Sequence, residues 1–403
     1  MDIRPLRESR DFRRLWIGQA VSYLGNMVTF VAVPIQLYHL TGSTLQVGLL
    51  SICDAVPLLL FSAIGGTIAD ALDRRRLALW SEAGLGVVVL LLAANSFLAE
   101  PMVWPLYALA FVGTSLWALG APALRAMMPG LVPQEQLAAS QALQSIYFNA
   151  GAIVGPAIGG ILIATAGFGA TYLIDVASFA FSVVLISLIS PARPKGDVDR
   201  PSFDSFKAGF RFLGNQPVIL GTFVLDTNAM VFGMPQALFP AVGAQHFDAG
   251  AGVVGFLYAS LAVGALLASL LSGWMEHVRR QGIGVAAAIV VWGAAIVGFG
   301  FATALWFGML MLAVAGAADS VSATLRSVIL YSNTPDAMRG RMNGIELAQV
   351  ASTPAIGNVE AGVVASLASL RASIVSGGVL CIVGVVAILA AMPKLVQYDA
   401  KKT

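Results

Sequence analysis

Three aspartates stand inside long apolar stretches of the sequence, where a charged group is costly. Asp54 and Asp226 are close to the middle of their stretches, and Asp319 lies nearer one end. A charge at the centre of a membrane-spanning helix costs at least about 2.5 kcal/mol, so such residues mark sites with a function. A buried carboxyl can bind a proton, because burial disfavours its charged form. We therefore expect proton binding at Asp226, Asp54 or Asp319; a structural ion pair is the alternative for Asp226.

Other charged residues lie nearer the ends of the apolar stretches. Asp175 and Glu360 are expected near the outer surface, where their side chains could reach toward water. Four more are expected near the inner surface, as gate residues or topology signals: Glu82, Arg125, Arg326 and Glu346.

The composition identifies the class of protein. Hydrophobic residues make up 58% of the 403 positions and charged residues 11%, with a mean hydropathy of +0.83. Soluble domains carry about 25% charged residues, so this is a multi-pass membrane protein. Cys53 and Cys381 lie far apart in apolar stretches, which predicts packing roles and no disulfide or metal site.

Twelve apolar stretches are long enough to span a bilayer, which takes roughly 20 helical residues. They are residues 15–38, 46–69, 77–98, 104–128, 138–165, 168–190, 217–243, 252–275, 283–303, 306–330, 343–368 and 372–392. The predicted fold is an all-α membrane protein with two pseudo-symmetric six-helix bundles, at residues 1–190 and 217–403.

The longest polar stretch, residues 191–216, separates six spans from six. Its second part, residues 202–213, alternates phenylalanine with charged residues, which predicts an amphipathic helix on the membrane surface. All of the 23 lysines and arginines except Arg371 would share one side with both termini. The positive-inside rule then places both termini in the cytoplasm.

The two halves of the sequence resemble each other. Arg125 and Arg326 end the fourth and tenth spans, and the pair Gly159-Gly160 has a counterpart in Ala361-Gly362. Internal duplication of this kind suits a transporter in which two similar bundles move around a site at the bilayer midplane. A channel would not require it.

The loop GGTIADALDRRR, at residues 65–76, carries five charged residues within seven positions. It resembles the loop between the second and third helices of the major facilitator superfamily, Gly-x-Leu-Ala-Asp-Arg-x-Gly-Arg-Arg. Ala71 and Asp73 depart from that pattern. The resemblance implies the major facilitator fold and a cytoplasmic gate, in which Asp70 faces a helix N-terminus of the other half. The gate set is Gly66, Asp70, Arg74, Arg75, Arg125 and Arg326; for Arg76 a topology signal is the preferred interpretation.

A second motif, GAIVGPAIGG at residues 151–160, places small residues every fourth position. Such a ridge lets another helix approach closely, and Pro156 removes one backbone donor from it. The motif is similar to GxxxGPxxGG in the fifth span of exporters of the superfamily, which implies export; ordinary helix packing is the alternative. Its specified residues are Gly151, Gly155, Pro156, Gly159 and Gly160.

The layout is similar to the enterobactin exporter group of the superfamily, from PLRESRDFRRLWIGQAVSYLGN at residues 5–26 to TPDAMRGRMNG at 334–344. The resemblance implies export of a siderophore-like or hydrophobic small molecule by proton antiport. A broad, macrolide-type multidrug efflux pump is the close alternative. A flippase for lipids or envelope precursors is a further one, with Arg125 and Arg326 as candidates for binding a phosphate.

Several polar residues are expected to line the substrate cavity: Gln19, Asn26, Asn149, Asn228 and Gln236. The sequence has no nucleotide-binding GxxxxGK[ST] motif and no histidine pattern for a metal, so we expect neither an enzyme nor a cofactor. The expected partners are a small-molecule substrate, protons and membrane lipids, without nucleic acid. The expected form is a monomer in a bacterial-type inner membrane.

We predict that Asp70→Asn inserts normally into the membrane but transports poorly, because the variant keeps the shape of the side chain and removes its charge. Asp204→Asn, in the polar linker, removes the same charge elsewhere and should transport like the wild type. Wild-type efflux from vesicles that contain the Asp70 variant would contradict the gate.

Overall fold

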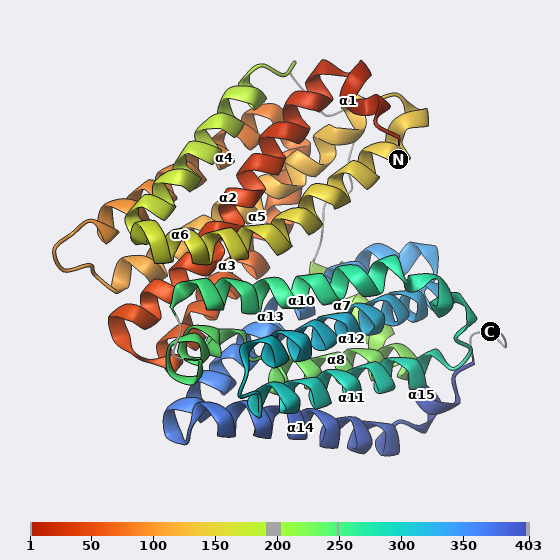
Figure 1. Ribbon diagram of the computed structural model, residues 1–403. Helices are drawn as coiled ribbons and strands as arrows, with labels where there is room; N and C mark the ends of the chain where they lie inside the picture. Colours follow the sequence, from red (N-terminus) through yellow and green to blue (C-terminus); the bar gives the residue numbers. More distant parts are fainter. Residues whose placement is uncertain (1, 191–202, 248–249, 400–403) are drawn as a thin grey trace. The chain divides into compact units, whose positions relative to one another are not determined.

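The computed structural model describes the backbone of residues 2–190, 203–247 and 250–399, and the side chains in these ranges outside 62–71, 203–208 and 337. The described residues form helices joined by short turns, with no strand among them (Figure 1). The chain divides into two compact units. Unit 1 is Met1–Gly42, Cys53–Pro201 and Ala249–Ala259, and unit 2 is Ser43–Ile52, Ser202–Asp248 and Ser260–Thr403.

Ten helical segments of the described part are long and apolar enough to cross a membrane. They are Arg10–Thr41, Thr44–Phe61, Arg74–Ser96, Trp104–Leu131, Gln134–Ser187, Pro217–His246, Ala251–Leu270, Gln281–Gly300, Leu305–Ser332 and Leu370–Ala391. The longest of them contains α6 (Leu137–Ser187), in which Gly167 has a φ of 78° and produces a kink. A residue with a side chain rarely adopts this left-handed conformation. The kink lies where the sequence separates two predicted spans.

Unit 1 is built around the contact between α2 (Arg10–Thr41) and α6, with α4 (Arg74–Ser96) packed against α5 (Trp104–Met127) and α6 (Figure 1). A core cluster at one end of the helices includes Phe12, Leu15, Leu143 and Ile186. The remaining elements are α1 (Arg4–Glu8), η1 (Met128–Leu131), η2 (Gln134–Gln136), the later part of α3 (Thr44–Ala71) and the first part of α10 (Ala251–Leu270).

The predicted glycine ridge of α6 packs against α2. A Cβ added at Gly159 would lie 3.2 Å from Cα of Val28, and one added at Gly155 would meet Met27. Gly151 faces Tyr23 in the same way. The absence of side chains at these positions allows the two helices to approach closely.

The other two residues of the motif face α10. A Cβ at Gly160 would lie 3.1 Å from Cα of Gly252, and one at Gly255 would meet the carbonyl of Pro156. The motif therefore has two packing surfaces, one on α2 and one on α10.

Unit 2 contains α8 (Pro217–Phe232), α11 (Gln281–Gly300), α12 (Leu305–Ser332), α13 (Asp336–Leu367) and α14 (Leu370–Ala391) as its long helices. α11 packs against α12 and α14, and α8 packs against α13 and α14. The predicted amphipathic helix is α7 (Phe203–Gly214). The remaining elements are η3 (Gln236–Leu238), α9 (Phe239–Ala241), η4 (Val242–His246), η5 (Ser272–His277), α15 (Pro393–Gln397), the first part of α3 and the later part of α10.

The packing of α13 on the first part of α3 repeats, within unit 2, the packing of α6 on the first part of α10 in unit 1. A Cβ at Gly362 would lie 3.1 Å from Cα of Leu45, and one at Gly48 would lie 3.2 Å from Cα of Val359. Gly362 thus occupies the position that corresponds to Gly160, as the duplication in the sequence indicates.

We predict that Gly155→Leu lowers the free energy of unfolding by about 1–3 kcal/mol, because the added side chain must displace α2. Gly344→Leu is the control, since a Cβ there meets nothing within 4 Å. Thermal unfolding of the purified variants in detergent would measure the difference. Equal stability of the two variants would contradict tight packing at Gly155.

Candidate functional site

A buried ion pair joins α8 to α12 in unit 2. Nη1 of Arg326 lies 2.7 Å from Oδ2 of Asp226, and the two side chains are 13% and 4% exposed. A third helix, α13, contributes Gln349, whose Nε2 lies 3.1 Å from the same carboxylate oxygen. This nitrogen also donates to the carbonyl of Phe223 at 2.7 Å. Asp226 is therefore held by side chains from two neighbouring helices.

A narrow pocket, too small in this conformation to hold a water molecule, lies beside this ion pair. It is lined by Asp226, Ala229, Met230, Ile289, Trp292, Ala318, Asp319 and Ser322. Asp319, Ser322 and Arg326 are spaced by three and four residues along α12, so they share one face of the helix. Oγ of Ser322 and Nε of Arg326 are buried and have no hydrogen-bond partner. The pocket thus contains one hydroxyl without a partner, that of Ser322, next to two carboxyls.

Charge is unevenly distributed around the pocket. Asp226, Asp319 and Glu346 all interact electrostatically with Arg326. Among the ion pairs of the described residues, Arg326 joins Asp226 and neither of the other two acids. If Asp226 gains a proton, its attraction for Arg326 weakens. Binding of a proton to Asp226 would therefore change the contacts that Arg326 makes.

In the sequence, Arg326 was expected at the gate, apart from Asp226. The structure brings the two side chains together, because α12 continues to Ser332 and Arg326 lies more than a turn before its end.

Asn228 is buried, and its amide donates to the carbonyl of Cys381 at 2.8 Å. It connects α8 to α14.

The third proton-binding candidate lies in unit 1. Asp54 of α3 is half-buried, and its Oδ1 accepts a hydrogen bond of 2.9 Å from Oγ1 of Thr114 in α5. The ion pairs found among the described residues do not include it. Asp54 therefore belongs to unit 1, and the cluster around Arg326 belongs to unit 2.

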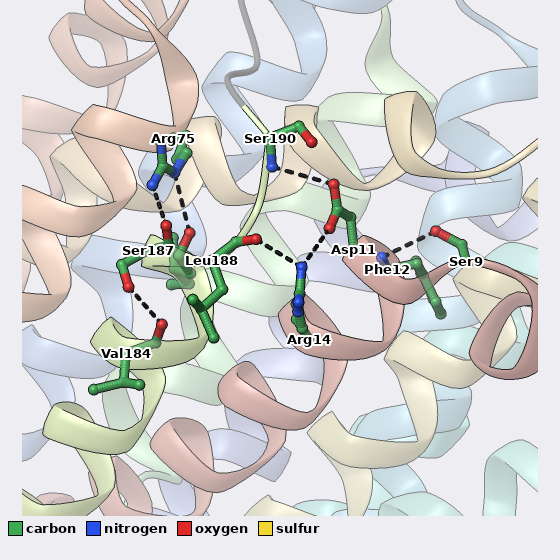
Figure 2. Close-up of polar contacts among 10 residues, drawn as sticks. Ser9, Asp11, Phe12, Arg14, Arg75, Val184, Ser187, Leu188 and Ser190 are labelled. Atoms are coloured by element: carbon green, nitrogen blue, oxygen red, sulfur yellow. Dashed lines mark hydrogen bonds and ion pairs between the residues drawn. The ribbon is translucent and has the colours of Figure 1, made fainter.

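Among the predicted gate residues, Arg75 contacts the end of α6. Its side chain donates to the carbonyls of Ile186 and Ser187, while Arg14 donates to the carbonyl of Leu188 at 2.7 Å (Figure 2). Asp11 accepts from the backbone of Ser190 at 3.1 Å. The last carbonyls of a helix lack partners within it and favour cations, so these arginines stabilise the end of α6.

The other gate candidates are spread over unit 1. The side chains of Gly66 and Asp70 lie outside the described residues. Arg74 is half-buried and donates to the carbonyl of Ala126 at 3.2 Å, whereas Arg125 is exposed.

The predicted cavity residues have different surroundings. Gln19 donates to Glu82 at 3.1 Å, and Asn149 is exposed with its amide bonded to Ser145 of its own helix at 2.8 Å. Asn26 and Gln236 are half-buried. The described contacts do not gather these residues into one site.

The sequence prediction was wrong for one buried acid, Asp175, and did not indicate the partners of another, Glu82. Asp175 is fully buried, so the prediction that it reaches toward outer water is wrong. Glu82 is 4% exposed and is bonded by Ser22 and Gln19. A pattern in α2 could have indicated these acids. Ser22, Gly25 and Thr29 are spaced by three and four residues, so two hydroxyls flank a glycine on the side of α2 that faces the acids.

Comparison with known proteins identifies the family. Residues 2–403 match the family described as transmembrane secretion effector. The enterobactin exporters EntS of Shigella boydii serotype 18 and Escherichia coli O81 are each 31% identical over 391 residues, which cover 96% of this chain and 94% of theirs. This chain belongs to the transmembrane secretion effector family of the major facilitator superfamily.

Solved structures support the fold of this family member. A POT family transporter in complex with 5-aminolevulinic acid has a TM-score of 0.74 at 14% identity, covering 96% of this chain and 97% of that one. The nucleoside transporter NupG has a TM-score of 0.70 at 12% identity, covering 96% and 99%. A bacterial homologue of the iron transporter ferroportin, in an inward-facing state, has a TM-score of 0.70 at 14% identity, covering 96% and 98%. This chain therefore has the fold of membrane transporters, and its relatives include exporters.

We predict that Arg326→Gln lowers the free energy of unfolding by about 3 kcal/mol, because it leaves the Asp226 carboxyl buried without its cation. The double variant Asp226→Asn/Arg326→Gln should recover most of this loss. Arg339→Gln, which breaks an exposed pair with Asp336, is the control and should change stability by about 0.5 kcal/mol or less. Unfolding of these three variants, Asp226→Asn and the wild type in detergent would measure the coupling, and a double variant whose loss equals the sum of the two single losses would contradict it.

Proposed function

We propose that this chain is a secondary active exporter that moves a siderophore-like or hydrophobic small molecule by proton-coupled alternating access. It works in a bacterial-type inner membrane, with twelve spans in two six-helix bundles and both termini in the cytoplasm. The kink at Gly167 divides α6 into two spans, and α13 adds a span to the apolar helices already named. Both support the count of twelve.

The observation that carries the proposal is the buried pair of Asp226 and Arg326 beside a pocket that also contains Asp319. In the described conformation, Arg326 forms an ion pair with Asp226. A proton that enters from outside neutralises Asp226 and releases the guanidinium toward the pocket, where Ser322 offers a free hydroxyl. Loss of the proton to the cytoplasm restores the ion pair. Proton movement inward is thereby coupled to a change in the binding site.

The substrate class is inferred from the relatives and from the site. Enterobactin exporters share 31% identity with nearly the whole chain. A hydroxyl of a siderophore could donate a hydrogen bond to ionised Asp226 and be displaced when a proton from outside neutralises this acid, whereas uncharged hydrophobic compounds would use only the apolar side chains beside it. Multidrug efflux is therefore the second candidate.

A flippase is less well supported. It needs a basic site for a phosphate head group, but Arg326 is paired with Asp226 and Arg125 is exposed. The expected partners remain the substrate, protons and lipids, and the expected form remains a monomer.

Asp226→Asn tests the coupling. The amide cannot carry a proton, so inside-out vesicles with an imposed proton gradient should not accumulate substrate. Exchange of substrate for substrate should survive, because it needs no net proton movement. Asp336→Asn, at an exposed position, should behave like the wild type. If the Asp226 variant still concentrated substrate under the gradient, the assignment would pass to Asp54 or Asp319.

A further inference from the structure

A row of buried polar side chains runs between α2, α4 and α6 in unit 1, whereas the pocket described above belongs to unit 2. It contains two acids, Glu82 of α4 and Asp175 of α6, which are 4% and 0% exposed. The other members are Gln19, Ser22 and Thr29 of α2 and Ser178 and Ser182 of α6.

The spacing of residues along the helices explains why these groups meet. Asp175, Ser178 and Ser182 recur every three or four residues and share one face of α6. Gly18 and Gly25 lie opposite them on α2: a Cβ at Gly18 would lie 3.4 Å from Cα of Ser182, and one at Gly25 would collide with Asp175 and Ser178. The glycines leave room for a carboxyl at the contact between the two helices.

No cation of the described structure pairs with either acid. The ion pairs found there do not include Asp175 or Glu82. The titratable groups within electrostatic reach of Asp175 are Glu82 and Tyr172. Glu82 in turn is near Tyr147, which also faces Tyr23 and Arg125. Arg125 is exposed, and the other groups are neutral or acidic, so an ionised Asp175 would be a buried charge without a cation.

The hydrogen bonds of Asp175 indicate where its proton lies. Oγ of Ser178 is 2.8 Å from Oδ1 of Asp175 and also 2.8 Å from the backbone carbonyl of the same residue. A hydroxyl has one hydrogen, so it can fully donate to only one of these two acceptors. If Oδ1 carries a proton, Asp175 donates to Ser178 and Ser178 donates to the carbonyl. Both short contacts are then satisfied.

The second carboxyl oxygen completes this network. Oγ1 of Thr29 in α2 donates to Oδ2 of Asp175 at 2.5 Å. A neutral carboxylic acid is one donor and one acceptor, which matches Ser178 on one side and Thr29 on the other. Because the two partners belong to different helices, displacement of α2 along α6 would remove one of them.

We propose that Asp175 is a second proton-binding site, which holds a proton on Oδ1 in the described conformation and releases it reversibly as the pH rises. This site lies in the unit that does not contain Asp226. It does not depend on the proposed export function, because proton binding can be measured on the purified protein without substrate.

Infrared difference spectroscopy tests the proposal, since a protonated carboxyl has a carbonyl stretch distinct from that of a carboxylate and sensitive to exchange into D₂O. The spectrum of Asp175→Asn in detergent should lack one such band. Ser178→Ala removes the acceptor of the proposed proton and should shift the same band. Asp336→Asn, at an exposed position, should leave it unchanged.

Two results would overturn the proposal. One is an unchanged set of protonated-carboxyl bands in Asp175→Asn, provided that circular dichroism shows the helix content of the wild type. The other concerns exchange: the band of the wild type should disappear reversibly as the pH rises, and a band that persists until the protein unfolds would show a proton that never leaves.

Discussion

The structure depends on one constraint, that polar groups removed from water must find partners inside the protein. Ser322 and Arg326 keep buried atoms without partners, but the carboxyls of Asp226 and Asp175 are both bonded. Unit 2 meets the constraint at Asp226 with a guanidinium, while unit 1 meets it at Asp175 with two hydroxyls. The site at Asp226 contains a cation and the site at Asp175 does not, so a proton affects the two sites differently.

Close approach of helices makes both solutions possible. Glycines at Gly155 and Gly159 bring α6 against α2, and Gly25 leaves room on α2 for the Asp175 carboxyl. In a membrane the hydrophobic effect does not drive helices together, so close packing and hydrogen bonds supply the stability. The glycine motif associated with exporters therefore has a direct structural role, and the same helices that it joins carry the buried acid of unit 1.

Charge also organises the ends of the helices. Arg75 and Arg14 donate to the last carbonyls of α6, and Asp11 accepts from the backbone just beyond them (Figure 2). Arg75 was predicted as part of a gate, and its described partners all lie in unit 1. A residue that stabilises the end of α6 can also belong to a gate, because a gate requires helix ends with defined positions.

The sequence by itself determined the class of protein, the positions of the apolar helices, the amphipathic helix α7 and the small-residue ridge, because these follow from hydropathy and from spacing along one helix. It also indicated Asp226 as a buried acid. Only the tertiary structure decided that Arg326 is its partner, that Asn228 bonds to Cys381, and that Asp175 is shielded from water. The rise per residue predicts depth along a helix, but the partner of a side chain depends on which other helix it faces, and that is a property of the packed bundle.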